Sequence, residues 1–212
     1  MARIVSKTVY SFSELSDSAK ERARDWWRDC ENQDFDTSCV FEDAVKCAEL
    51  IGITIKHHPV KLMNGTTRYD PSIYYEGFCV QGSGACFDGS YAYVKGAAKA
   101  IRQHAPQDEK LHAIADSLQA IQRKHFYRVE AEMRHAGRYM HSGYMNVEVT
   151  LRDSDSYDAP ACEDHIRSVM RDFADWIYSQ LEAEYTYRMS DENVDESIEI
   201  NEYEFNEDGS RA

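Results

Sequence analysis

The sequence predicts an α+β fold: a mainly antiparallel sheet packed by amphipathic helices, with a long C-terminal helix followed by an acidic edge strand or tail. Apolar residues recur every three to four positions over residues 162–189, which is typical of a helix with one buried face. Aromatic-rich runs at 73–80 and 86–93 flank a glycine-rich stretch, which is typical of paired strands. With 212 residues, 42% of them hydrophobic, the chain is long enough to bury one core.

The same two periodicities assign the other elements in chain order. Helical spacing predicts helices at residues 17–30, 37–51, 94–104, 108–124 and 162–189. Gly52 is a suitable stop for the second of these helices, since glycine favours the left-handed conformation at a helix end. Strand-like alternation predicts strands at residues 4–10, from 53 onward, at 73–80, at 86–93, in a hairpin of 125–135 with 144–152, and at an edge formed by 197–205.

No stretch rich in proline, serine or glycine reads as a linker, so we expect a single domain over residues 1–190, with 191–212 as its acidic C-terminal segment. No apolar run approaches the roughly 18 residues that a membrane span needs, and residues 1–7 lack the apolar core of a secretory signal. We therefore expect a cytoplasmic protein that does not bind membranes. The six cysteines contain no Cys-x-x-Cys pair, so we expect reduced thiols.

Negative charge is concentrated at the C-terminus. The net charge is -14, and residues 191–212 hold nine acids and one base, which gives -8 for that segment. Such a field repels nucleic acid and attracts basic surfaces, so we expect no direct binding of DNA or RNA. Two interpretations remain open: a solvated edge that keeps the protein soluble, or a surface that mimics a phosphate backbone.

Residues 77–89 combine four glycines, two cysteines and a glutamine within strand-like sequence. Clustered glycines in strands predict a bulge, a turn or close approach of another backbone. The run from Gln81 to Cys86 also partly resembles the papain-type pattern of an oxyanion-binding glutamine and a nucleophilic cysteine. A cysteine-dependent hydrolase is therefore an alternative, with candidate bases at His125, His135, His141 and His165. A tight turn with a buried Cys86 is the favoured interpretation.

Other sites of known chemistry are not indicated. The glycines lack the Lys-Ser/Thr that follows in phosphate-binding loops. His57–His58 and the pair His135 and His141 do not have ligand spacing typical of a metal site. Residues 153–158 lack the glycine and the terminal glutamate of a calcium loop. We expect no cofactor and no metal.

The residues expected to bind a partner are six acids of the C-terminal segment and one large aromatic residue, a type enriched in binding hot spots: Glu196, Glu199, Glu202, Glu204, Glu207, Asp208 and Trp27. Three sequence blocks bear on what that partner is: residues 10–20 with 23–27, the segment 77–87, and the tail from 190 to 205. These blocks resemble those of small uncharacterised proteins of tailed bacteriophages and prophages, some of which carry the label of antitoxins of toxin–antitoxin systems.

That resemblance implies an accessory protein that acts by protein binding in the bacterial cytoplasm. Small acidic proteins of phages often bind a host enzyme or defence complex, so we expect a non-enzymatic inhibitor of a defence system, such as a CRISPR effector or a restriction enzyme. An antitoxin that neutralises a protein toxin is a further alternative. The sequence leaves open the identity of the target, the oligomeric state and the reactivity of Cys86.

Overall fold

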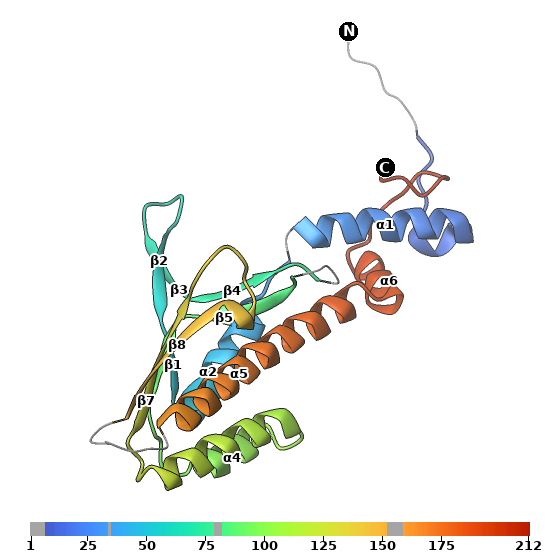
Figure 1. Ribbon diagram of the computed structural model, residues 1–212. Coiled ribbons are helices and arrows are strands. Elements are labelled where there is room, and N and C mark those ends of the chain that lie inside the picture. The colour runs from blue at the N-terminus through green and yellow to red at the C-terminus, as the bar shows by residue number, and fades with distance from the viewer. Residues whose placement is uncertain (1–6, 34, 79–81, 152–158) are drawn as a thin grey trace. The chain divides into compact units, whose positions relative to one another are not determined.

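The computed structural model describes residues 7–33, 35–78, 82–151 and 159–212 (Figure 1). Strands and helices occur in separate runs along the chain, and the strands pair antiparallel, so the α+β class and the long C-terminal helix are confirmed. The chain divides into two compact units: unit 1 is Met1–Asp36 with Glu182–Ala212, and unit 2 is Thr37–Leu181. The single domain expected from the sequence stays a prediction.

The described part of unit 2 contains three antiparallel sheets. The four-stranded sheet has the order β1 (Ile53–Ile55), β6 (Gly89–Tyr91), β7 (Val129–His135) and β8 (Met145–Leu151). The predicted hairpin around residues 137–143 is thereby confirmed. The two-stranded sheets are β2 (His57–Lys61) with β3 (Thr67–Pro71), and β4 (Ile73–Glu76) with β5 (Gly84–Phe87). The β2–β3 hairpin, which was not predicted from the sequence, projects beyond the helices of unit 2 in Figure 1.

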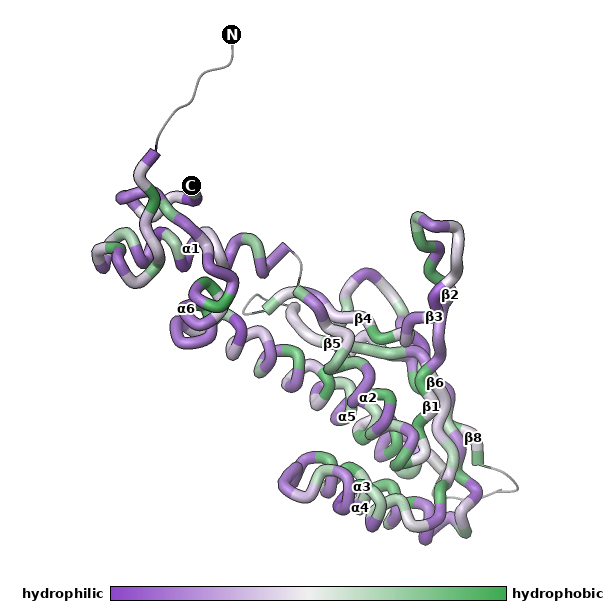
Figure 2. The backbone as a smooth tube through the Cα atoms, turned by 180° about the vertical axis from the view of Figure 1, so that it is seen from behind, coloured by the Kyte–Doolittle hydropathy of each residue, from purple (hydrophilic) through white to green (hydrophobic). Residues whose placement is uncertain are grey.

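Helices cover one side of the four-stranded sheet (Figure 1). They are α2 (Ser38–Ile51), α3 (Ala97–His104), α4 (Glu109–Lys124) and the part of α5 (Ala159–Arg188) that belongs to unit 2. On α2, Ala44, Ala48 and Ile51 of the apolar face are buried, and Gly52 ends the helix in the left-handed conformation with φ +90. The alternation of hydrophobic and hydrophilic residues along α5 in Figure 2 follows the helical period that predicted it.

The strand predicted at residues 86–93 is wrong as a single element, because the chain changes sheet at Asp88. Strand β5 pairs with β4 before this residue, and β6 pairs with β1 and β7 after it. Glycine permits the transfer: a Cβ on Gly89 would lie 2.5 Å from the Thr54 carbonyl oxygen. The close backbone approach that the glycines predicted is therefore confirmed at this residue.

Unit 1 consists of a short 3-10 helix, η1 (Phe12–Glu14), with α1 (Asp17–Gln33), the end of α5, and α6 (Asp191–Ile200). A separate apolar cluster forms its core: Phe12, Leu15, Ala19, Ala23, Val194, Ile198 and Phe205. Tyr10, Trp26, Trp27 and Tyr203 are partly buried against that cluster.

The acidic edge strand predicted at residues 197–205 is wrong. Ser190 caps α6 by accepting a hydrogen bond from the Asn193 amide, and Asp191 and Glu192 occupy the first helical turn, where the helix dipole favours acids. Val194 and Ile198, four positions apart, are buried together, which gives the segment a helical period. Only Phe205 has extended pairing, in isolated bridges with Tyr10 and Arg211. Of the strand predicted at 4–10, residues 4–6 lie outside the described residues. Residues 7–10 do not form a strand, since Tyr10 has only its isolated bridge with Phe205.

Candidate functional site

A groove of about 590 Å³ lies in unit 1, between η1 and the C-terminal end of α6. It is lined by Val9, Tyr10, Ser11, Phe12, Ser13, Glu14, Ile198, Glu199, Glu202, Tyr203 and Glu204. Four of these residues are glutamates and three are aromatic, and among the described residues the lining contains no lysine or arginine. We call this feature the acidic groove. It gathers three of the predicted partner-binding residues: Glu199, Glu202 and Glu204.

Local hydrogen bonds fix the η1 wall of the acidic groove. The Ser11 amide and the Ser11 hydroxyl both donate to the Glu14 carboxylate, at 2.8 Å each. These bonds lower the pKa of Glu14, so that its carboxylate is held in the charged form. Tyr10 is tied to Phe205 by two backbone hydrogen bonds of 2.9 Å. The segment before α1 is thus fastened to the segment after α6.

The α6 wall contains an unusual backbone conformation. Glu202 follows the helix with φ +51, in the left-handed region where glycine or asparagine is normally found. The Tyr203 amide donates to the Ile198 carbonyl oxygen across this turn. Glu199, Glu202 and Glu204 are exposed, and within the described residues their carboxylates form no ion pair. These three negative charges are therefore available to a partner.

Other acids of the C-terminal segment hold unit 1 together. Asp191 pairs with Arg28, Asp195 with Arg24 and Asp208 with Arg22, so each of these acids ties the segment to α1. Asp208, one of the predicted partner-binding residues, also accepts hydrogen bonds from the Ser210 amide and hydroxyl, which lower its pKa. We therefore infer that Asp208 stabilises unit 1 rather than binds a partner. Glu196 and Glu207 are exposed but do not line the acidic groove.

Trp27 is half-buried in an aromatic cluster rather than displayed to solvent. Its ring centroid lies 6.3 Å from that of Trp26 and 5.7 Å from that of Tyr203. Arg211 adds a cation above the same cluster, 4.7 Å from the Tyr203 ring centroid. The indole Nε1 of Trp27 is buried and has no hydrogen-bond partner among the described residues. Trp27 supports Tyr203, which does line the acidic groove.

Cys86 of β5 is completely buried, as the favoured interpretation of the glycine segment expected. Burial, with a smaller contribution from Asp88, raises the pKa of its thiol to about 12. A nucleophilic cysteine needs a lowered pKa and access to substrate, so this environment does not favour the hydrolase alternative. Gln81, the proposed oxyanion-binding residue, lies outside the described residues.

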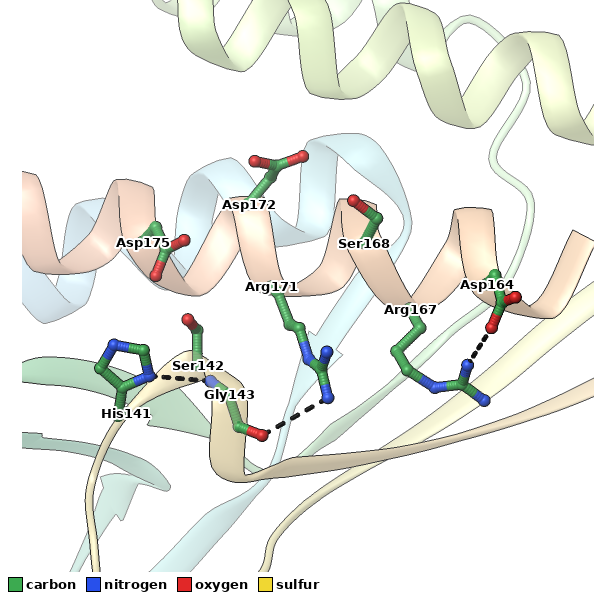
Figure 3. A pocket seen from close by; sticks show the side chains of 9 residues that line it. All are labelled: His141, Ser142, Gly143, Asp164, Arg167, Ser168, Arg171, Asp172 and Asp175. Carbon is green, nitrogen blue, oxygen red and sulfur yellow. Dashed lines mark hydrogen bonds and ion pairs between the residues drawn. The ribbon is translucent and has the colours of Figure 1, made fainter. Parts of the chain in front are cut away.

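A second hollow, of about 380 Å³, lies in unit 2 between η2 (Ser142–Tyr144) and α5 (Figure 3). Arg171 points toward the Gly143 carbonyl oxygen at 3.4 Å, and His141 Nδ1 accepts from the Gly143 amide at 2.9 Å. Asp164 pairs with Arg167, and Asp172 pairs with Lys110. Two of the three acids in the lining are thus paired, and the lining combines three acids with two arginines, so its charge does not single out an anion or a cation as ligand.

Sequence reasoning missed the η1 wall, including Tyr10, Phe12 and Glu14. The local signal is present: Ser11 and Glu14 have the spacing of a capping box. That motif predicts a helix start but cannot indicate that η1 lies beside residues almost two hundred positions later.

The chain matches one protein family, described as Domain of unknown function (DUF8835), over residues 37–191. No curated protein and no solved structure is significantly similar to it. In the described parts of the chain, no helix combines the length and the apolar character needed to cross a membrane. The match covers unit 2 and includes none of the residues that line the acidic groove. Because the match spans most of the sequence, the chain belongs to the DUF8835 family.

Proposed function

We propose that this chain is a non-enzymatic protein that binds and inhibits a partner with a basic, nucleic-acid-binding surface, and that the acidic groove is its contact site. The observation that carries this proposal is the gathering of Glu199, Glu202 and Glu204 around one groove, exposed and without an ion pair to any described residue. Carboxylates that already have cationic partners contribute little to recognition, whereas unpaired ones attract a positive surface.

Charge asymmetry between the units supports the same conclusion. Unit 1 holds 19 acids and 8 bases, a net charge of -11, whereas unit 2 holds 19 acids and 16 bases, a net charge of -3. Glu192, Glu196 and Glu199, at spacings of four and three residues, share an exposed face of α6. A helix face with regularly spaced carboxylates resembles a phosphate backbone in charge, so it suits a protein surface that normally binds nucleic acid.

Aromatic side chains give the acidic groove a second means of recognition. Tyr10, Phe12 and Tyr203 line it together with the glutamates. Aromatic faces and carboxylates together favour arginine, whose guanidinium stacks on rings and donates paired hydrogen bonds to carboxylate oxygens. The expected contact is therefore an arginine-rich segment of the partner.

The resemblance to proteins of tailed phages and prophages suggests the setting. In that setting the chain acts in the bacterial cytoplasm, and its partner is a nucleic-acid-handling complex of a defence system such as a CRISPR effector or a restriction enzyme. An antitoxin has the same mode of action with a different target, so the identity of the partner decides between them.

The test is protection of phage plating in bacteria that carry a defined CRISPR or restriction system. The wild-type chain is compared with the triple variant Glu199→Lys, Glu202→Lys and Glu204→Lys. The matched control is Glu42→Lys, Glu76→Lys and Glu148→Lys, which changes the charge equally at exposed residues of unit 2. We expect the wild type and the control to restore plating and the groove variant to fail. Equal protection by both variants would reject charge recognition at the acidic groove.

A further inference from the structure

Three metal-ligating side chains meet in unit 2, far in sequence from the acidic segment. Asp43 and Cys47 lie one turn apart on α2, and His104 is the last residue of α3. One ligand atom from each residue lies within 4.8 Å of the other two. His104 Nε2 is 3.2 Å from Asp43 Oδ1, and Cys47 Sγ is 3.9 Å from Asp43 Oδ2. Atoms bound to zinc at about 2.0–2.3 Å in tetrahedral geometry stand roughly 3.5 Å apart.

We propose that Asp43, Cys47 and His104 bind a divalent transition-metal ion of the zinc class, with water as the fourth ligand. A thiolate, an imidazole and a carboxylate are the three donor types that zinc takes from proteins. Magnesium and calcium prefer oxygen donors throughout, so the cysteine argues against them. Three protein ligands leave one position open, which allows a water molecule or a small ligand to bind.

The surroundings of Cys47 favour a cation. Its side chain is completely buried, yet the negative charges of two carboxylates, those of Asp43 and Asp108, act electrostatically on its sulfur. When a divalent cation binds the sulfur, the S–H bond breaks, the proton leaves to solvent, and a sulfur–metal bond forms without any change of oxidation state.

Neighbouring groups set the entry path and limit the ligand set. The side chains of Asp43 and His104 are 57% and 35% exposed, so an ion can reach the site from solvent. Asp108 is not a fourth ligand, because its carboxylate already accepts hydrogen bonds from the Leu111 amide at 2.9 Å and from Trp176 Nε1 at 2.7 Å. All three proposed ligands lie within the residues matched by the family.

A simpler interpretation is an exposed ion pair between His104 and Asp43. Such pairs contribute little to stability, on the order of 0–1 kcal/mol, and do not involve a cysteine. The two interpretations differ in whether Cys47 contacts the ion. Thiolate–cobalt charge-transfer absorption answers that question directly, because it requires a sulfur–metal bond.

The experiment uses the full chain after removal of metal with a chelator. Zn²⁺ is added and the bound amount is measured by elemental analysis after dialysis; Co²⁺ is added to a second sample for absorption spectroscopy. The variants are His104→Gln, Asp43→Asn and Cys47→Ser. Their controls are His165→Gln, at an exposed histidine of α5, and Cys39→Ser, at an exposed cysteine on the same helix as Cys47. Circular dichroism checks that each variant folds.

We expect one Zn²⁺ per chain, a thiolate–cobalt band, and affinity lowered at least roughly tenfold by His104→Gln, since even outer-shell partners of metals contribute about 10–100-fold. The control variants should bind as the wild type does. If Cys47→Ser fails to fold, the cobalt band of the wild type and the metal affinity of His104→Gln still test whether the three residues bind the ion. Absence of binding, absence of the thiolate band, or equal affinity in a folded His104→Gln variant would each overturn the proposal.

Discussion

Arg24 of α1 and Asp195 of α6 form a two-point ion pair, with Nε–Oδ1 at 2.6 Å and Nη2–Oδ2 at 2.7 Å. This geometry is the strong form of the arginine–carboxylate interaction. The hydrogen bonds to Asp195 raise the pKa of Arg24, and only 16% of the Arg24 side chain is exposed. The acids of the C-terminal segment therefore have two roles: Asp195 joins α6 to α1, while the neighbouring Glu199 faces a groove.

Asp195→Asn should lower the free energy of unfolding by about 1–2 kcal/mol, because it removes the charge from a partly buried two-point pair. Glu196→Gln, one residue further along α6 and exposed, should change it by less than about 0.5 kcal/mol. Urea denaturation of both variants measures the difference. Equal stability of the two would contradict the division into structural and exposed acids.

Glu202→Gly should raise the free energy of unfolding by about 1 kcal/mol. The residue has φ +51, and glycine adopts this conformation without the steric cost that a Cβ imposes. Glu204→Gly is the control: Glu204 does not have a positive φ, so glycine there should leave stability unchanged or lower it. Thermal unfolding of both variants provides the comparison. A destabilised Glu202→Gly would show that the Glu202 side chain stabilises unit 1. A Glu202→Gly variant that is more stable but no longer binds the partner would show that the Glu202 carboxylate serves recognition rather than stability.

Alkaline pH should destabilise the protein partly through Cys86. The pKa of its thiol is about 12 in the folded chain against an ordinary value of 9.0. The folded state thus resists loss of the proton, so this stabilisation is complete below pH 9 and declines as the pH rises toward 12. Cys86→Ala should reduce the loss of stability between pH 7 and about pH 10.5, whereas Cys39→Ala, at an exposed cysteine, should not. Identical pH dependence in the two variants would contradict the buried thiol.

The helices could be predicted because their apolar residues repeat within a single segment. The period in α5 and the Gly52 stop in α2 are local signals, and both correspond to the observed elements. The β2–β3 hairpin also had a local signal, since Asn64–Gly65 is a pair typical of tight turns between strands. The glutamates at 199–204 can be identified from the sequence as a charged cluster. The strand predicted for part of their segment is wrong because it leaves out of account the four-residue spacing of Val194 and Ile198, which indicates a helix.

Features built from distant residues could not be predicted in this way. Gln122 of α4 is completely buried, where its side-chain amide exchanges hydrogen bonds with the backbone of Val129 and donates to the Tyr91 hydroxyl. Nothing in the local pattern distinguishes it from an exposed glutamine. The same holds for His104, whose neighbours Asp43 and Cys47 lie on another helix.

The acidic groove is proposed to recognise a basic partner protein. The most direct measurement is affinity purification of the tagged chain from a nuclease-treated bacterial lysate, with mass spectrometry that compares the wild type, the Glu199/Glu202/Glu204→Lys variant and the Glu42/Glu76/Glu148→Lys control. We predict that one nucleic-acid-handling protein is recovered in equal ratio with the wild type and the control, is lost with the groove variant, and dissociates as salt is raised. Recovery of the same protein in equal amount with the groove variant would contradict the claim.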